Sequence, residues 1–242
     1  MLQKTKGIVL HYIKYGDTSI IAYIYTEIFG RQAFIVNGVR KKSSKIRLSQ
    51  FQPLSILELD VYYKPNREIQ RIKDLKNSLL LQTVHDNIVK SSIALFIAEI
   101  MYKTLREVEP NKPLFDFIFN SIHILDIKDK GIENYHLVFL LLLSKYLGIS
   151  PVDEDQKSIE FTVTDQQALK KSDKGLSFIL TEEEKAAMIQ LHEYSFNKLE
   201  KIKIDNKTRS NLLERFVEYF KLHLEGIGTI KSLTVLKEVF TA

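Results

Sequence analysis

The sequence predicts an α+β protein in which a small closed β-barrel precedes an all-helical domain. Three observations lead to this prediction. Residues 6–75 are rich in β-branched and aromatic residues and are punctuated by turn signals. From Ser78 onward, apolar residues recur at helical spacing, and a polar stretch at 152–178 interrupts the helices. We therefore expect a barrel domain at residues 1–77 and a helical domain at 78–242 that carries a small insertion.

The barrel prediction rests on five short strands separated by turn residues. Tyr15-Gly16-Asp17 follows the first expected strand, and Asn37-Gly38 follows the third. A sheet this small leaves exposed edges unless it closes on itself, which favours a barrel. The expected strands are Gly7–Lys14, Ser19–Thr26, Gln32–Val36, Leu54–Tyr63 and Glu68–Leu75.

The helical half shows clear start and stop signals. Pro110 ends the first helix, and Thr181 with Glu184 three residues later forms a capping box. The third helix is apolar on all sides, which predicts the buried centre of a bundle. The expected helices are 78–109, 113–127, 132–147, 181–201, 206–225 and 230–241, and the insertion holds two candidate strands, Ile159–Val163 and Gly175–Phe178.

Positive charge is concentrated in one segment near the N-terminus. The chain has 35 Lys and Arg against 30 Asp and Glu, and Ile28–Leu57 holds six of the basic residues and none of the acidic ones. The rest of the chain, with 29 basic and 30 acidic residues, is nearly neutral. A block of like charge repels itself unless a negative partner meets it, which favours a phosphate backbone. The alternative is a solvated loop without a partner.

Several classes of function lack any sequence signal. The chain has no cysteine, which excludes disulfides and thiolate zinc sites, and no glycine spacing fits a phosphate-binding loop. The six histidines are not at metal-binding spacing, no serine lies in a nucleophile elbow, and no carboxylate pair is distinctive, so we expect no enzyme, metal or cofactor. The N-terminus lacks a signal-peptide pattern, and the apolar run Leu137–Leu143 is too short to span a bilayer, which predicts a cytoplasmic protein without membrane contact.

A barrel with aromatic strand residues beside a cationic loop is suited to nucleic acid, because cations follow phosphates while rings stack on bases. A core position remains an alternative for each ring, and a solvated helix face remains one for the two later arginines. The candidate DNA-binding cations are Arg31, Arg40, Lys41, Lys42, Lys45, Arg47, Arg209 and Arg215. The candidate stacking rings are Tyr23, Tyr25, Phe34, Tyr62 and Tyr63.

A series of short segments in a fixed order points to a known family. They are Gly7-Ile-Val-Leu10 with Tyr15-Gly-Asp17, Thr26–Gly30, Gly38–Lys45 with Gln50-Phe-Gln-Pro53, Ala98-Glu99, Tyr146–Pro151, and Tyr219, His223-Leu224 and Lys231-Ser-Leu233. No single segment is specific. In this order and at this spacing, over nearly the whole chain, they resemble the bacterial recombination-mediator family RecO.

The resemblance implies a fold, a function and a set of partners. It implies an N-terminal OB-fold barrel and a helical domain, non-enzymatic binding of single- and double-stranded DNA, and annealing of complementary strands at the nucleoid. It also implies contact with RecR and with the C-terminal tail of single-strand-binding protein, so that RecA can load. Many members carry a four-cysteine zinc ribbon, whereas the matching region 152–178 has no cysteine here, so we expect a metal-free remnant.

The expected mechanism is electrostatic: Arg31 and the cations at 40–47 bind two backbones and relieve the repulsion that opposes pairing. A different class remains open, a protein–protein scaffold whose basic loop docks an acidic partner. A nuclease that uses scattered carboxylates is a more distant alternative.

Overall fold

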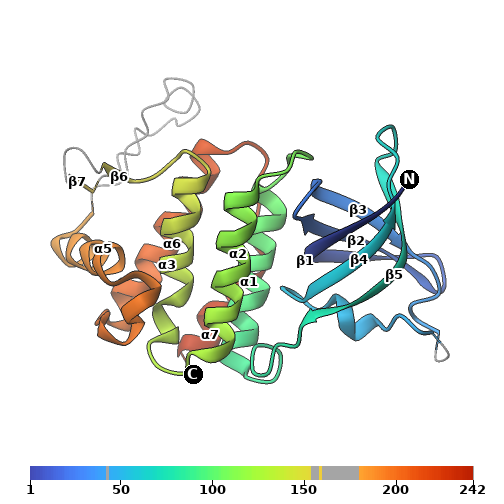
Figure 1. Ribbon diagram of the computed structural model, residues 1–242. Coiled ribbons are helices and arrows are strands. Elements are labelled where there is room, and N and C mark those ends of the chain that lie inside the picture. Colours follow the sequence, from blue (N-terminus) through green and yellow to red (C-terminus); the bar gives the residue numbers. More distant parts are fainter. Residues whose placement is uncertain (42–43, 154–157, 160–179, 242) are drawn as a thin grey trace. The chain divides into compact units, whose positions relative to one another are not determined.

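The computed structural model describes residues 1–41, 44–153, 158–159 and 180–241 (Figure 1). Contacts divide the chain into two compact units, Met1–Ile127 and Lys128–Ala242. The first unit contains a barrel and two helices, and the second contains the later helices. The two helices that follow the barrel are therefore grouped with it, whereas the sequence pattern alone places them with the helical half.

The predicted closed barrel is confirmed. Its strands are β1 (Leu2–Tyr15), β2 (Ser19–Thr26), β3 (Gly30–Val36), β4 (Ile56–Tyr62) and β5 (Ile69–Leu79). They close in the order β1-β2-β3-β5-β4, with β1 antiparallel to both β2 and β4 and with β3 parallel to β5. This is the order of an OB fold, in which closure removes the exposed edges.

Strand alternation builds the barrel core. Ile20, Ala22 and Ile24 of β2 point inward and are fully buried. Gly7 of β1 leaves no room for a side chain, because a Cβ atom there would lie 2.5 Å from the Ile24 side chain and 3.0 Å from that of Leu59. The short 3₁₀ helix η1 (Leu48–Phe51) adds Phe51 to the same core.

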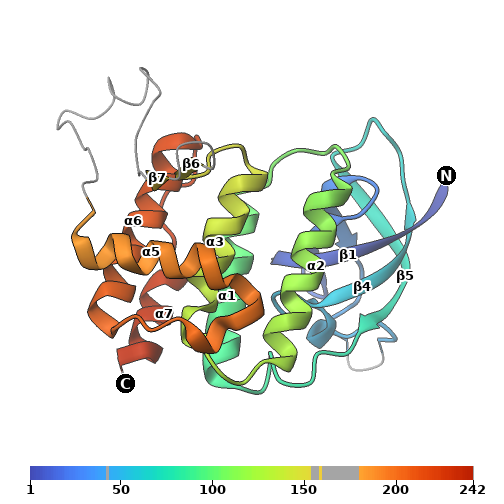
Figure 2. The same ribbon diagram turned by 60° about the vertical axis from the view of Figure 1, so that its left-hand side comes forward.

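Two helices cover one side of the barrel within the first unit. They are α1 (Ile88–Thr104) and α2 (Lys112–Ile127), and they lie beside the barrel in both views (Figures 1 and 2). The sequence pattern predicts that the first helix begins at Ser78, but β5 continues to Leu79 and the helix begins at Ile88. The Asn87 side chain sets this start by accepting hydrogen bonds from the backbone of Val89 and Lys90.

The turn between β2 and β3 is fitted to the segment that joins the two helices. Gly30 has φ +60, and a Cβ atom there would come within 2.7 Å of the Glu107 carbonyl oxygen. The backbone N–H of Arg31 donates to that carbonyl at 2.9 Å. Glycine is required at this position both by the left-handed backbone and by the close approach.

The second unit is helical. Its elements are η2 (Ile132–Asn134), α3 (Tyr135–Tyr146), α5 (Glu182–Tyr194), η3 (Ser195–Lys201), α6 (Asn206–His223) and α7 (Ser232–Thr241). α3 is buried along most of its length, as its apolar sequence predicts. The capping box of Thr181 and Glu184 is confirmed, but the helix it opens ends at Tyr194, where Ser195 adopts φ +47.

Among the described helices, none is both long and apolar enough to cross a membrane.

The insertion is described only in part. Strands β6 (Val152–Asp153) and β7 (Ser158–Ile159) form an antiparallel pair. The predicted strands Ile159–Val163 and Gly175–Phe178 lie outside the described residues except for Ile159. The likeness of this insertion to a zinc ribbon stays a prediction.

Candidate nucleic-acid interface

The connection between β3 and β4, residues 37–55, carries most of the predicted cations and is named the basic loop. Its first part is fixed to the turn between β1 and β2. The Arg40 backbone N–H donates to the Thr18 carbonyl at 3.0 Å, and the Arg40 Nη1 atom donates to the Gly16 carbonyl at 3.4 Å. This part of the loop is therefore held against the barrel.

The second part of the basic loop is attached to β5. Lys45 Nζ lies 2.7 Å from a carboxylate oxygen of Asp74, and Gln50 donates to the Asn77 side chain at 3.4 Å. The hydrogen bond from Lys45 lowers the pKa of Asp74 below its usual value. Both partners of this ion pair remain exposed to solvent, 81% for Lys45 and 43% for Asp74, so the bond is open to competition from other anions.

Three of the predicted loop cations remain available. Arg40, Lys41 and Arg47 are exposed, and none forms an ion pair within the described part of the chain. Lys42 lies outside the described residues. These three cations therefore keep a positive charge that no carboxylate in the described part of the chain pairs with.

Arg31, in contrast, is built into the first unit. Its Nη1 atom donates to the Tyr102 carbonyl at 2.8 Å, and its guanidinium lies 5.5 Å from the centre of the Tyr102 ring. Burial lowers the pKa of Arg31, although the Tyr102 phenol opposes this shift. Arg31 therefore packs between β3 and α1, a contact that local sequence could not reveal because the partners are 71 residues apart. Phosphate binding by this half-buried residue stays a prediction.

The two predicted arginines of α6 also have structural partners. Arg209 is buried and donates to the Asn134 side chain at 3.1 Å and to the Ile204 carbonyl at 2.8 Å. Arg215 forms a 2.8 Å ion pair with Glu184, which is itself almost fully buried. These bonds connect elements within the second unit. Burial leaves Arg209 little surface for a phosphate, whereas phosphate binding by the partly exposed Arg215 stays a prediction.

The five candidate rings separate into buried and accessible ones. Phe34 is fully buried in the barrel core, and Tyr25 is 3% exposed beneath Phe115 of α2. Burial raises the pKa of Tyr25 to about 12, and Glu107 adds to the shift. A base cannot reach either ring, which corrects the prediction for both.

The remaining three rings differ in their accessibility. Tyr23 is half-buried, with its ring centre 5.0 Å from that of Tyr102. Tyr63 stacks on Phe29 with the ring centres 4.0 Å apart, and both rings pack against the barrel core. Tyr62, on β4, is 44% exposed and is the most accessible of the five candidates.

These contacts show that the outer side of β2 is occupied. OB folds commonly bind oligonucleotides on the face of strands 2 and 3. Here Tyr23, Tyr25 and Arg31 from those strands contact Tyr102 or Phe115 of α1 and α2. A nucleic acid would therefore have to bind elsewhere on the barrel.

A groove of about 590 Å³ runs over the outer surface of β1, β4 and β5. Its charges are balanced, because the cations alternate with carboxylates across the strands: Lys6 is opposite Glu58, and Glu58 is opposite Lys76. The lining cations are Lys4, Lys6, Lys45 and Lys76, and the lining carboxylates are Glu27, Glu58, Asp60 and Asp74. The groove is therefore a poor site for a polyanion.

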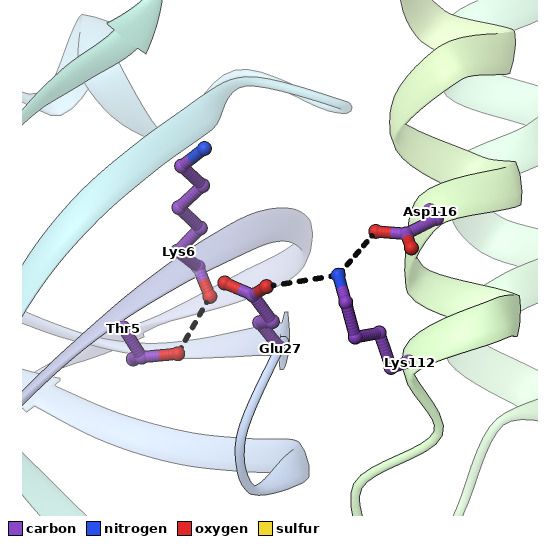
Figure 3. A network of polar contacts seen from close by, with 5 residues as sticks. All are labelled: Thr5, Lys6, Glu27, Lys112 and Asp116. Carbon is purple, nitrogen blue, oxygen red and sulfur yellow. Dashed lines mark hydrogen bonds and ion pairs between the residues drawn. The ribbon is translucent and has the colours of Figure 1, made fainter.

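A polar network at one end of this groove joins α2 to the barrel (Figure 3). Lys112 bridges two carboxylates, at 3.4 Å from Glu27 and 3.0 Å from Asp116. Lys6 extends over Phe119 at 5.5 Å from the ring centre. These cations hold the helix against the barrel.

Two exposed cations of β5, Arg71 and Lys73, were not among the sequence candidates. They lie on the outer side of β5, which alternates regularly from Ile69 to Lys73. Their positive charge does not stand out in the sequence, because the acidic residues Glu68 and Asp74 flank them. Strand alternation is the signal that could have identified them.

The described residues contain no group of three or more His, Asp and Glu side chains placed to hold a metal ion.

The fold and the exposed cations define an OB-fold protein with a candidate polyanion-binding surface, followed by a helical unit. Comparison with known proteins matches both parts of the chain to one family. Residues 1–78 match the family described as "Recombination protein O N terminal", and residues 85–233 match "Recombination protein O C terminal". The chain belongs to this family, RecO, and thus to the proteins of DNA repair and recombination.

Relatives of similar length support this assignment. The DNA repair protein RecO of Phocaeicola vulgatus is 38% identical over 243 residues, covering all of both chains. That of Bacteroides fragilis is 36% identical over 241 residues, 99% of this chain and 100% of the relative. That of Flavobacterium psychrophilum is 34% identical over 239 residues, 98% of this chain and 99% of the relative.

Proposed function

We propose that this protein is a non-enzymatic recombination mediator that binds single- and double-stranded DNA and anneals complementary strands. Family membership supports the role in repair, and the exposed basic loop supports the DNA contact. The observation that carries the proposal is a group of exposed cations, Arg40, Lys41 and Arg47, which form no ion pair among the described residues and lie on a loop fixed to the barrel at both ends.

The proposed mechanism follows from charge. Two DNA strands repel each other through their phosphates, and bound cations reduce that repulsion by releasing condensed counterions. The loop is fixed to the barrel at both ends, so its cations would neutralise two backbones side by side. Base pairing then supplies the driving force for annealing.

A charge-removal experiment tests this mechanism. The variant R40A/K41A/K42A/K45A should bind a labelled single-stranded oligonucleotide more weakly in fluorescence anisotropy and should anneal complementary strands more slowly. For binding through about five phosphates, the log–log salt dependence of the wild-type affinity should have a slope of roughly −3.5. The variant should lose most of that slope.

The matched control removes the same charge elsewhere. The control uses four exposed lysines of the second unit: Lys130, Lys185, Lys198 and Lys201. The variant K130A/K185A/K198A/K201A should retain the wild-type affinity and salt slope. Equal losses in both variants would show that only net charge matters. Unchanged affinity in the loop variant would refute the proposal and favour the protein-scaffold alternative.

We further propose that RecR and the acidic, apolar-ended tail of single-strand-binding protein bind this chain, so that RecA can assemble on covered DNA. Such a tail requires an apolar groove rimmed by cations. Titrating a labelled tail peptide with the full chain tests this contact. Binding should be saturable and should disappear for a peptide that lacks the apolar end, and RecA assembly should require RecR.

A further inference from the structure

The outer face of β5 alternates cations with an apolar residue. Ile69, Arg71 and Lys73 point outward and are exposed, whereas Gln70 and Ile72 between them point into the barrel and are buried. Ile69 is 42% exposed, which is high for a large apolar side chain in a strand. This face therefore offers both charge and an apolar surface to a ligand.

Strand register brings an aromatic ring to the same face. Arg71 is paired with Tyr62 of β4 on one side and with Ile35 of β3 on the other. Directly paired residues point to the same side of a sheet, and in the antiparallel pair of Tyr62 and Arg71 the Cβ atoms are about 4.5–5.5 Å apart. A phenol ring, a guanidinium and an aliphatic side chain thus form one row, named here the β5 row: Tyr62, Arg71 and Ile35.

The cations of this face are not neutralised by ion pairs. Within the described residues neither Arg71 nor Lys73 forms an ion pair, and the adjacent Asp74 is already bonded to Lys45. Glu68 is the other carboxylate close by in the sequence. An anionic ligand would therefore meet two exposed positive charges beside an exposed ring, of which Lys73 also attracts the Asp74 carboxylate.

The basic loop begins next to this face. β3 and β5 run parallel, with Ile35 opposite Arg71. The basic loop thus begins two residues after the partner of Arg71, and its Lys45 returns to β5 at Asp74, the neighbour of Lys73 in the sequence. β5 lies on the side of the barrel away from α1 and α2 in both views (Figures 1 and 2).

We infer that the β5 row and the nearby Lys73 form a subsite specific for single-stranded DNA. Arg71 and Lys73 bind phosphates, and one unpaired base stacks on Tyr62. This inference rests on the proposed DNA binding and assigns different ligands to the basic loop and to the β5 row. The basic loop binds any polyanion by charge, whereas a ring can accept only a base whose face is free. In a duplex the base faces are already stacked, so the β5 row discriminates between the two forms.

The primary test compares Tyr62→Ala with the wild-type protein on a single-stranded oligonucleotide and on its duplex. Stacking of one base contributes favourable binding free energy, and its loss should weaken single-strand binding at least about fivefold. Duplex binding should change less than about twofold. Tyr146→Ala is the matched control, because Tyr146 has a similar exposure of 42% on α3 and should leave both affinities unchanged.

Two further measurements separate stacking from structural damage. Tyr62→Leu keeps an apolar side chain on the barrel and should show the same selective loss with an unchanged melting temperature. A strand with abasic sites should bind the wild-type protein and Tyr62→Ala equally well. R71A/K73A should reduce the salt slope on single strands by about 1.4, corresponding to two phosphates.

The outcomes distinguish this inference from the proposed function. If Tyr62→Ala weakens single-strand and duplex binding equally, or weakens neither, the subsite is refuted while the role of the basic loop stands. If the wild-type protein binds no DNA at low salt, both proposals fail. Selective loss on single strands supports the subsite.

Discussion

The carboxylate of Asp126 ties the chain between β5 and α1 to the end of α2. It is buried and accepts hydrogen bonds from the backbone N–H groups of Gln82, Thr83 and Val84, at 2.8–3.2 Å. The buried ammonium of Lys90 donates to the Asp126 carbonyl at 2.9 Å. Burial raises the pKa of Asp126, but the backbone donors outweigh burial and the net pKa is lowered from 3.8.

This site predicts a stability change with a definite pH dependence. Asp126→Asn should lower the free energy of unfolding by about 2 kcal/mol at pH 7, because charged acceptors form the stronger hydrogen bonds. The folded pKa lies below the unfolded one, so the stabilisation is complete above about pH 4 and disappears as the pH falls through the folded pKa. Urea unfolding of both proteins at pH 7 and below pH 4 should show the difference narrowing in acid; a constant difference would contradict it.

Residue type alone does not determine what a cation does in this protein. Arg40 is exposed without an ion pair among the described residues, whereas Arg31 and Arg209 have lowered pKa values because burial disfavours their charge. A buried guanidinium needs several acceptors, and Arg209 finds them on Asn134, Asn206 and Ile204. An arginine in such a position stabilises the fold and is removed from the candidate interface.

At the scale of elements, the contact between the basic loop and β5 sets how much charge the loop offers. Asp74 on β5 holds Lys45 at 2.7 Å. Under the proposed mechanism, a DNA phosphate would have to compete with this carboxylate for the lysine. The pair is solvent-exposed, so this competition should adjust affinity without blocking binding.

Removing the competing carboxylate should tighten DNA binding. We expect Asp74→Asn to raise single-strand affinity by about twofold and to steepen the salt slope by about 0.7, corresponding to one additional phosphate. Anisotropy titrations at several salt concentrations measure both values. The control is the same substitution in a Lys45→Ala background, where the gain should vanish; a gain that persists there would show that Asp74 acts by general repulsion.

At the scale of the whole molecule, the barrel strands and the first two helices form one compact unit, Met1–Ile127. The contacts of Tyr23 and Tyr25 with Tyr102 and Phe115 show why, since the helices cover rings that the barrel alone would expose. Asp126 adds a polar tie at the end of the same unit. The division of the chain into folding domains is therefore a prediction that fragments can test.

We expect residues 1–127 to fold as an independent domain and residues 1–79 to be unstable. The longer fragment should remain monomeric in size-exclusion chromatography and unfold cooperatively by circular dichroism. The shorter fragment should aggregate or melt at a much lower temperature. Each large apolar side chain that loses its cover reduces the free energy of unfolding by about 1.5–3 kcal/mol. Equal melting temperatures for the two fragments would contradict this division.

Local patterns were sufficient for much of the fold. β-branched, aromatic and turn residues predicted the five strands, and the exposed edges of so small a sheet predicted its closure. The Thr181–Glu184 spacing predicted a capping box that the structure confirms. The start of the first helix was misplaced because β5 extends to Leu79 before Asn87 caps α1. Residues 78–79 could join a strand or a helix by propensity alone. Their place in β5 depends on pairing with β4, where Leu79 is opposite Ile56.

The sequence by itself determined where positive charge is concentrated, which segments form strands and helices, and the family to which the order of its motifs belongs. Only the tertiary structure decided which cations stay available and which rings are exposed. Arg31 and Tyr25 lie in strands whose outer sides are covered by helices far along the chain, while Tyr62 and Arg71 share an uncovered face. Exposure depends on packing between segments distant in sequence, and local periodicity contains no information about that packing.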